Sequence, residues 1–406
     1  MNADAKELAS SFDLEKLTPE FYDNPYPTYR ALRENEPVKR LRNGTVFLTR
    51  YDDLVTTYKN TKSFSSDKKR EFAPKYGDTP LYEHHTTSLV FNDPPSHTRV
   101  RRLIMGALSP RAIAGMEGDL IKLIDGLLDA IAAKGACELI EDFAASIPIE
   151  VIGILLDVPH EERGPLRNWS LAILGALEPV VSPDVAARGN SAVTDFLAYL
   201  ETLVARRRQK PGNAERDVLT RLIEGEENGE RLTEKELLHN CIFLLNAGHE
   251  TTTNLIGNGL VALDRNPDQK QRLIDNPGLI KTAVEEMLRY ESSNQLGNRM
   301  TTEKVEIGGV MLDAGTSVTL CIGAANRDPA QFPDPERFEI ARTPNRHLAF
   351  ATGAHQCAGM ALARLEGAIA ISRFLARFPN YAVSGQPVRG GRVRFRGFLS
   401  VPCALR

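Results

Sequence analysis

A loop near the C-terminal end carries the residues best suited to chemistry. Cys357 lies between Gly353 and Gly359, and an apolar pattern with a helical period follows over residues 360–378. The cysteine therefore stands just before a helix N-terminus, where free backbone N–H groups and the helix dipole stabilise a thiolate. A thiolate is the form of cysteine that binds a metal or attacks an electrophile.

The neighbours of Cys357 indicate a flat partner. Gly353 and Gly359 let the backbone approach such a partner closely, and Phe350 could pack against it. A thiolate held beside a large planar ligand is typical of axial ligation of haem iron. The alternative is a buried cysteine in a turn, because an isolated free cysteine usually packs as a small apolar residue.

A long helix is expected over residues 234–265. Thr233 and Glu236 form a capping-box pattern at its start, and Asn266-Pro267 ends it. Its centre holds a polar run, residues 246–253, that includes Gly248 and threonines able to bend a helix. Such a distortion would make room for a ligand beside Thr251, with Glu250 as a proton source. The alternative is the solvated face of an amphipathic helix.

Four further residues could neutralise two carboxylates. His97 and Arg101 are one helical turn apart, and Arg299 and His355 could join them through charge-assisted hydrogen bonds. The propionates of haem are such carboxylates. Each residue taken singly is more often a surface group.

Two other patterns are weak by themselves. Glu286 and Arg289 are three apart on a helix and can pair, although such pairs are usually surface pairs of little energy. A proline-rich turn, residues 332–338, presents Arg337.

Composition narrows the class of protein. The chain has 406 residues, 42% hydrophobic and 25% charged, with a net charge of −3, which argues against a general nucleic-acid or membrane-surface role. Its five cysteines are scattered, so neither a disulfide framework nor a structural zinc site is expected, and a reducing cytosol suits them. We expect no signal peptide and no transmembrane helix.

The pattern along the chain is mostly helical, with small sheets near the two ends. A hairpin is expected over 38–50 with Asn43-Gly44 at its turn, and short strands over 304–320 and 381–405. Residues 64–92 show no clean period and are expected to form a long functional loop. Besides 234–265, helices are expected over 96–107, 116–134, 140–156, 160–175, 190–208, 215–225 and 279–290. We expect one domain, 1–406.

Taken in order, these motifs resemble the cytochrome P450 family, and specifically its soluble bacterial members. The resemblance spans nearly the whole chain and rests on His97-x-x-x-Arg101, Ala247-Gly248-x-Glu250-Thr251, Glu286-x-x-Arg289, Arg299, Pro335-Glu336-Arg337-Phe338 and the loop from Phe350 to Gly359. It implies a cytochrome P450 fold, mainly α with small β-sheets and a long central helix over haem, with no fused reductase and no membrane anchor.

The resemblance also assigns roles to residues. Cys357 would be the proximal thiolate ligand of haem b, in a loop bounded by Phe350 and Gly359. His97, Arg101, Arg299 and His355 would hold the propionates, and Glu250 and Thr251 would be the acid–alcohol pair that delivers protons during dioxygen activation. A structural triad of Glu286, Arg289 and Arg337 would lie behind the haem.

The activity implied is that of a monooxygenase. One atom of O2 would enter a small organic substrate by hydroxylation, epoxidation or dealkylation, and the other would leave as water. No flavin- or iron–sulfur-binding segment is visible, so electrons would come from a ferredoxin-type donor with an NAD(P)H-dependent reductase. This donor would dock on basic residues near Cys357, namely Arg101, Arg102, Arg346 and Arg364. A cytoplasmic monomer is expected. A haem-thiolate peroxygenase and a non-catalytic haem-binding sensor are the alternatives.

Positions that line the pocket in relatives give the expected substrate site. They are the 80–90 loop with Phe243, Asn246, Ala247, Gln295, Leu296 and Phe398. Two residues depart from the family pattern. Ala351 stands where glycine is common, and alanine costs about 1 kcal/mol of stability if the backbone there is left-handed. Ser293 stands where proline is common.

Overall fold

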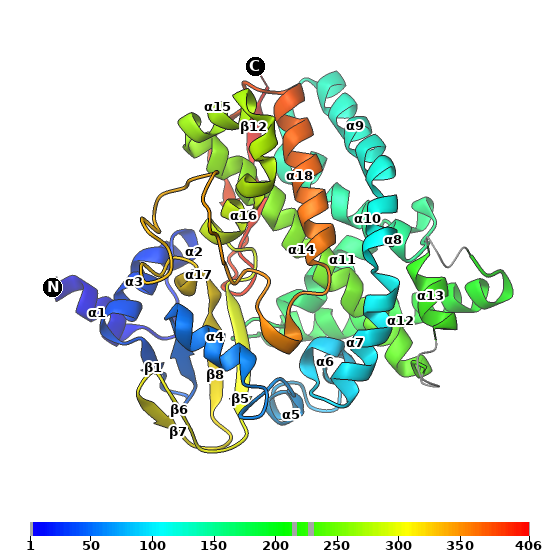
Figure 1. Ribbon diagram of the computed structural model, residues 1–406. Helices are drawn as coiled ribbons and strands as arrows, with labels where there is room; N and C mark the ends of the chain where they lie inside the picture. The colour runs from blue at the N-terminus through cyan, green and yellow to red at the C-terminus, as the bar shows by residue number, and fades with distance from the viewer. Residues whose placement is uncertain (1–2, 213–216, 226–230, 406) are drawn as a thin grey trace.

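Helices make up most of the computed structural model, which describes residues 3–212, 217–225 and 231–405 (Figure 1). The α-helices are α1 (Ala3–Ser11), α2 (Pro19–Asp23), α3 (Tyr26–Asn35), α4 (Tyr51–Lys59), α5 (Lys69–Tyr76), α6 (Pro80–Thr87), α7 (Ser96–Ala107), α8 (Pro110–Gly115), α9 (Glu117–Lys134), α10 (Ser146–Leu155), α11 (Leu166–Gly175), α12 (Pro183–Gln209), α13 (Val218–Glu224), α14 (Glu234–Arg265), α15 (Pro267–Asp275), α16 (Ile280–Tyr290), α17 (Ile322–Ala325) and α18 (Met360–Arg377).

The central helix α14 has the predicted bounds. The Thr233 hydroxyl accepts a hydrogen bond from the backbone N–H of Glu236, and the Glu236 carboxylate accepts one from the backbone N–H of Thr233. These reciprocal bonds satisfy two of the N–H groups that a helix start leaves without partners. At about 1.5 Å per residue the helix is about 48 Å long, and the other helices pack around it.

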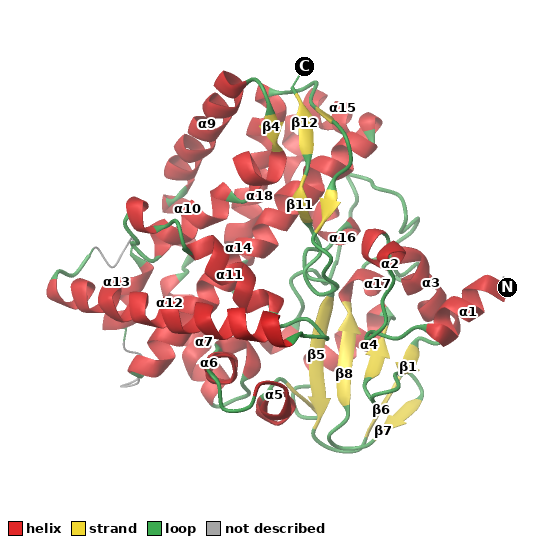
Figure 2. Ribbon diagram, turned by 180° about the vertical axis from the view of Figure 1, so that it is seen from behind, coloured by secondary structure: helices red, strands yellow, loops and turns green. Residues whose placement is uncertain are grey.

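The largest sheet joins segments from distant parts of the chain. Its strand order is β1 (Val38–Arg40), β2 (Val46–Leu48), β8 (Ser317–Cys321), β5 (Leu296–Thr301) and β3 (Phe64–Ser65). The β1–β2 hairpin is antiparallel as predicted, whereas β2 pairs with β8 in parallel. Figure 2 shows this sheet beside the helical part. The smaller sheets are formed by β4 (Cys137–Glu138), β6 (Val305–Ile307), β7 (Val310–Leu312), β9 (Ala382–Val383), β10 (Val388–Arg389), β11 (Phe398–Ser400) and β12 (Pro402–Ala404).

The prediction of a long loop over 64–92 is wrong. This segment contains β3, α5, α6 and a short 3-10 helix, Leu89–Phe91. Pro74 inside α5 and the mixture of charged and aromatic residues conceal the helical period. The expected helix over 140–156 is instead a π-helical turn, Leu139–Ala144, followed by α10, and α12 begins seven residues before the expected start at 190.

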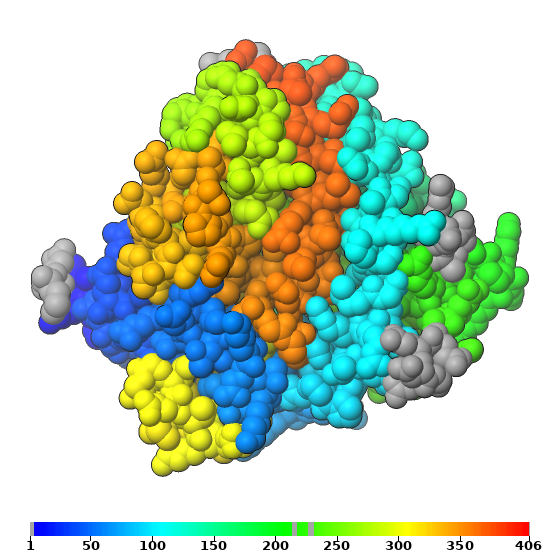
Figure 3. Space-filling model, in the orientation of Figure 1, coloured from blue at the N-terminus to red at the C-terminus, as the bar shows by residue number. Residues whose placement is uncertain are grey.

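The core divides into three clusters of buried apolar side chains. One fills the helical part, and two smaller ones lie on either side of the five-stranded sheet. Figure 3 shows the early segment (blue) against the β6–β7 hairpin (yellow) at the lower left of the molecule. Among the described residues, no helix is both long and apolar enough to cross a membrane.

Candidate active site

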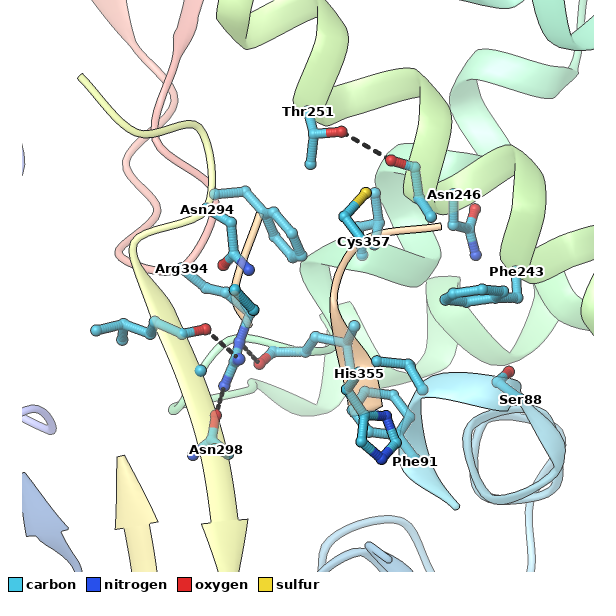
Figure 4. Close-up of a pocket in the computed structure, with 18 of the residues that line it drawn as sticks. Ser88, Phe91, Phe243, Asn246, Thr251, Asn294, Asn298, His355, Cys357 and Arg394 are labelled. Atoms are coloured by element: carbon cyan, nitrogen blue, oxygen red, sulfur yellow. Dashed lines mark hydrogen bonds between the residues drawn. The ribbon is translucent and has the colours of Figure 1, made fainter. Parts of the chain in front are cut away.

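A cavity of about 570 Å³ lies between α14, the cysteine loop, the segment of α5 and α6, and strand β5 (Figure 4). Both Thr251 on α14 and Cys357 on the facing loop line it. Sequence positions more than 100 residues apart therefore meet around one space.

The cysteine loop owes its shape to two left-handed residues. Ala351 has φ of +52° and Gly353 has φ of +76°. A Cβ added at Gly353 would lie 2.7 Å from the backbone oxygen of Tyr58, so only glycine fits there. The Cys357 N–H donates to the carbonyl of Phe350 at 2.9 Å, which closes the loop just before Gly359, the N-cap residue of α18. The backbone at Ala351 is left-handed, so the cost of about 1 kcal/mol considered for alanine in that case applies.

The surroundings of Cys357 have opposite effects on the pKa of its thiol. Burial raises the pKa of its thiol, whereas the Gly359 backbone N–H and the guanidinium groups of Arg101 and Arg364 lower it. The side chain is nevertheless accessible from the cavity that it lines. A metal cation at the sulfur would supply the positive charge that favours the thiolate. A Cβ on Gly359 would meet no protein atom within 4 Å, so the loop leaves room for a flat ligand beside it.

The four expected carboxylate-binding residues all line the same cavity. The imidazole rings of His97 and His355 lie 3.9 Å apart between their centroids. Arg101 donates to the carbonyl of Gln356 at 2.6 Å, and the buried Arg299 donates to the carbonyl of Asn298 at 2.7 Å. No carboxylate of the described residues forms a recorded ion pair with either guanidinium.

This cluster therefore lacks an anion. Both ring nitrogens of His97 and the Nε2 of His355 are buried without a hydrogen-bond partner. Burial and the charge of Arg299 lower the pKa of His355 to about 2, so its ring is neutral at physiological pH. Buried imidazole nitrogens without hydrogen-bond partners are costly, and so is a buried guanidinium without a counter-charge in contact, as at Arg299. Two carboxylates would satisfy them, and the cluster therefore fits the propionates of haem.

Glu250 and Thr251 face different surroundings on α14. The Thr251 hydroxyl donates to the carbonyl of Ala247 at 2.7 Å and lies on the cavity wall. Glu250 points away from the cavity and forms a bidentate ion pair with Arg392, with distances of 2.7 and 2.9 Å. Burial raises the pKa of Glu250 to about 7, although Arg392 lowers it.

The helix itself is continuous through this polar run. A Cβ at Gly248 would lie 2.6 Å from a methyl group of Ile152, so the glycine admits a side chain of α10. The expected room for a ligand is thus provided by the cavity beside Thr251 and not by a break in α14.

Glu366 on α18 is a cavity residue that the sequence motifs did not single out. It is fully buried, its Oε2 has no partner, and burial raises its pKa to about 8. A pKa of about 8 favours the protonated carboxyl group at pH 7. Its position nine residues after Cys357 is the sequence signal that could have identified it.

Four of the six expected pocket residues line the cavity, namely Phe243, Asn246, Ala247 and Leu296. The expectation that Gln295 and Phe398 line the pocket is wrong, because neither residue lines the cavity. The Gln295 amide turns away and donates to the carbonyl of Ser292 at 2.7 Å, whereas Phe398 packs under the guanidinium of Arg389 at 3.9 Å. Ser293 lines the cavity, and its carbonyl accepts from the N–H of Arg396 at 2.8 Å.

The structural triad is also corrected. Glu286 is fully buried and pairs with Arg289 through two bonds of 2.8 Å. Its second cationic partner is Arg342, at 3.1 Å, whereas the Arg337 side chain is 64% exposed and pairs with Glu339. Only the backbone carbonyl of Arg337 takes part, as an acceptor from Arg289. The sequence motif located the loop but not the guanidinium that turns inward.

The sequence and the structure were compared with known proteins. The profile of the family described as Cytochrome P450 matches residues 174–388. A relative named biotin biosynthesis cytochrome P450, from Bacillus subtilis (strain 168), is 37% identical over 364 residues, which cover 89% of this chain and 91% of the relative. The 6-deoxyerythronolide B hydroxylase of Saccharopolyspora erythraea is 36% identical, covering 88% and 90%.

Solved structures agree with this assignment. The structure of P450BioI in complex with hexadec-9Z-enoic acid ligated acyl carrier protein superposes with a TM-score of 0.90 at 35% identity, covering 96% of this chain and all of the other. A myxobacterial cytochrome P450 in complex with myristic acid gives a TM-score of 0.88 at 35% identity, covering 97% and 99%. The chain belongs to the cytochrome P450 family and is a haem-thiolate monooxygenase.

Proposed function

We propose that Cys357 holds the iron of haem b and that His97, Arg101, Arg299 and His355 hold its propionates. The observation that carries this proposal is the buried imidazole nitrogens without partners, beside two guanidinium groups that form no ion pair among the described residues, in the same cavity as an accessible thiol. When bound, haem supplies the activation of dioxygen for transfer of one oxygen atom to the substrate.

Glu250 and Thr251 would move the protons that this reaction needs. A carboxyl group with a pKa of about 7 can hold or release a proton near neutral pH, which suits a general acid–base group. The Thr251 hydroxyl donates to the helix backbone, so its oxygen remains able to accept a hydrogen bond from the cavity. A rotation of the Glu250 side chain away from Arg392 would connect the two.

The Thr251→Ala variant tests this role. We expect it to bind haem and substrate but to release more hydrogen peroxide per electron pair consumed. Without the Thr251 hydroxyl, the protons needed for oxygen transfer to the substrate would be delivered less efficiently. Thr253→Ala is the matched control, since Thr253 makes the same kind of bond, to the carbonyl of His249 at 3.0 Å, on a buried part of α14. Unchanged coupling of product to electrons in Thr251→Ala would refute the assignment.

The substrate pocket is proposed to take an organic compound with an apolar body. Phe243, Ala247 and Leu296 provide apolar walls. Asn246 is 4% exposed, and its Oδ1 has no hydrogen-bond partner. It is therefore proposed as an acceptor for a polar group of the substrate.

The electron donor is proposed to be a ferredoxin-type protein with an NAD(P)H-dependent reductase. Basic side chains near Cys357 support this, although Arg364 is partly neutralised by Glu285 at 2.6 Å and stacks over Phe350 at 4.8 Å. A cytoplasmic monomer of one domain, 1–406, is part of the same proposal. Reconstitution with such a donor should support turnover, whereas turnover with hydrogen peroxide alone would favour the peroxygenase alternative.

A further inference from the structure

One end of the cavity, formed by Lys68, Lys75 and Arg394, is rich in positive charge. We call it the basic end. Lys68 is 2% exposed and pairs with Glu71 at 2.6 Å. Arg394 donates to the carbonyl of Leu296 at 2.9 Å and to the side-chain oxygen of Asn298 at 2.5 Å, the bond drawn in Figure 4. These bonds hold Lys68 and Arg394 in place. Of the three cations at the basic end, only Lys68 pairs with a carboxylate.

Lys75, like Arg394, has no side-chain partner of opposite charge among the described residues. Its ammonium donates to the backbone carbonyl of Glu178 at 2.8 Å, and no ion pair of Lys75 is recorded within the described part of the chain. The two nearby carboxylates are engaged elsewhere. Glu71 binds Lys68, and the Glu178 carboxylate accepts from the backbone N–H groups of Val393 and Arg394 at 3.0 and 3.2 Å.

The charges around Lys75 shift the pKa of its ammonium. Desolvation and the charge of Arg394 lower the pKa of Lys75 to about 8, and Lys68 lowers it further, whereas Glu71 and Glu178 raise it. Lys75 is an exposed side chain that lines the cavity, so a ligand in the cavity can reach its ammonium. An anion bound there would supply the opposite charge that the ammonium lacks.

His85 adds a second group without a partner at this end. It lines the cavity, is 1% exposed, and its Nε2 has no hydrogen-bond partner. Burial and the charges of Lys75 and Arg394 lower its pKa to about 3, so the ring is neutral and can donate one N–H. The rings of Phe72, Tyr76 and Phe91 surround His85 at centroid distances of 5.5 to 5.8 Å. Of these, Phe72 and Phe91 line the cavity and form an apolar wall near Lys75.

We propose that the substrate is an organic carboxylic acid whose carboxylate binds Lys75 at the basic end, while its apolar body extends along the cavity towards Cys357. This inference rests on the proposed function, because it places the acid in the substrate pocket of that site. The Lys75 ammonium supplies the opposite charge, and His85 is the neighbouring neutral donor.

Matched ligands test the proposal. Isothermal titration calorimetry of the haem-loaded protein at about pH 7 would compare tetradecanoic acid with tetradecanol and methyl tetradecanoate. We expect the acid to bind about 10- to 100-fold more tightly than the alcohol or the ester, the range of a charge-assisted hydrogen bond. Lys75→Met should remove this preference without weakening the alcohol. Lys69→Gln is the control, because Lys69 is on the same helix but pairs with Asp67 at the surface.

The pH dependence gives a second measurement. Because the carboxylate binds the protonated amine, its affinity should fall as the pH rises above about 8, whereas the alcohol should bind equally at each pH. In Lys75→Met the acid should lose this pH dependence.

Three results would overturn the proposal, namely equal affinities for acid, alcohol and ester, an unchanged preference in Lys75→Met, and binding only of an acyl chain linked to a carrier protein. The absorption spectrum of each reduced, carbon-monoxide-treated sample shows whether the carboxylate-binding proposal or the proposed function itself has failed. A thiolate-type band with no acid preference refutes only the basic end, whereas a missing band refutes the haem assignment.

Discussion

The buried carboxyl group of Glu250 makes the stability of the protein depend on pH in a predictable way. Burial raises its pKa to about 7 from the usual 4.5, even though Arg392 is bonded to it. The folded protein therefore keeps a proton that the unfolded chain has already released. As pH rises from about 4.5 to about 7, the free energy of unfolding falls by about 1.4 kcal/mol per pH unit from this group, and above pH 7 the loss stays constant at about 3 kcal/mol.

The Glu250→Gln variant isolates this effect. Glutamine has the same shape and cannot titrate, so losing the bond to Arg392 changes stability equally at every pH. We expect the stability of the variant relative to the unchanged protein to rise by about 2 kcal/mol between about pH 5.5 and about pH 8.5, because the proton-linked penalty grows by that amount over the interval. Urea unfolding of the haem-loaded proteins at these pH values measures the difference.

A control and a refuting result complete this test. Glu234→Gln removes an exposed carboxylate that pairs with Arg208 at 2.5 Å, and it shows how much the loss of a surface ion pair contributes by itself. If the difference between Glu250→Gln and the unchanged protein does not vary with pH, Glu250 does not hold a proton near neutrality. The proton-delivery role proposed for it would then lose its physical basis.

Three further predictions concern the cavity and its support. Arg342→Met should lower the free energy of unfolding by about 3 kcal/mol because it leaves the buried Glu286 short of a cation, whereas Arg337→Met should change it by less than about 0.5 kcal/mol, both measured by urea unfolding. Equal effects would show that Arg337 is the partner after all. Ala351→Gly should raise stability by about 0.5 kcal/mol, since it relieves about 1 kcal/mol of left-handed strain and the more flexible unfolded glycine takes back about half. A lower free energy of unfolding in Ala351→Gly would argue against a positive φ at residue 351. Arg299→Leu should speed haem transfer to apomyoglobin about tenfold or more, because a propionate loses a charge-assisted bond, and an unchanged rate would exclude that contact.

Local patterns in the sequence were sufficient for the elements with strong start and stop signals. The capping box at Thr233 and the Asn266-Pro267 stop gave the bounds of α14, because capping depends only on residues within one turn. The loop of Cys357 before a helix was likewise predictable from the spacing of its residues, whereas the left-handed backbone at Ala351 was seen only in the structure. Helices α5 and α6 were missed because their stability comes from packing on the cavity wall, which a periodicity test of eight residues does not register.

The partners of side chains were decided only by the tertiary structure. The motif around residue 337 indicated a guanidinium for Glu286, but the fold turns Arg342 inward and leaves Arg337 at the surface, and both are arginines in one loop. Gln295 and Leu296 were both expected in the pocket, but only Leu296 lines it, because the Gln295 amide donates a hydrogen bond to the carbonyl of Ser292 instead.

The sequence alone thus determined the family, and it led to the proposals of Cys357 as the iron ligand and of Glu250 and Thr251 as the proton-delivery pair, because each lies in a short motif whose geometry is local. The tertiary structure decided the charge balance of the cavity. Lys75, Arg394 and His85 come from separate segments and carry no shared motif, and only folding shows that their neighbouring carboxylates are already engaged. Electrostatic environment depends on distance in space, which sequence spacing does not record.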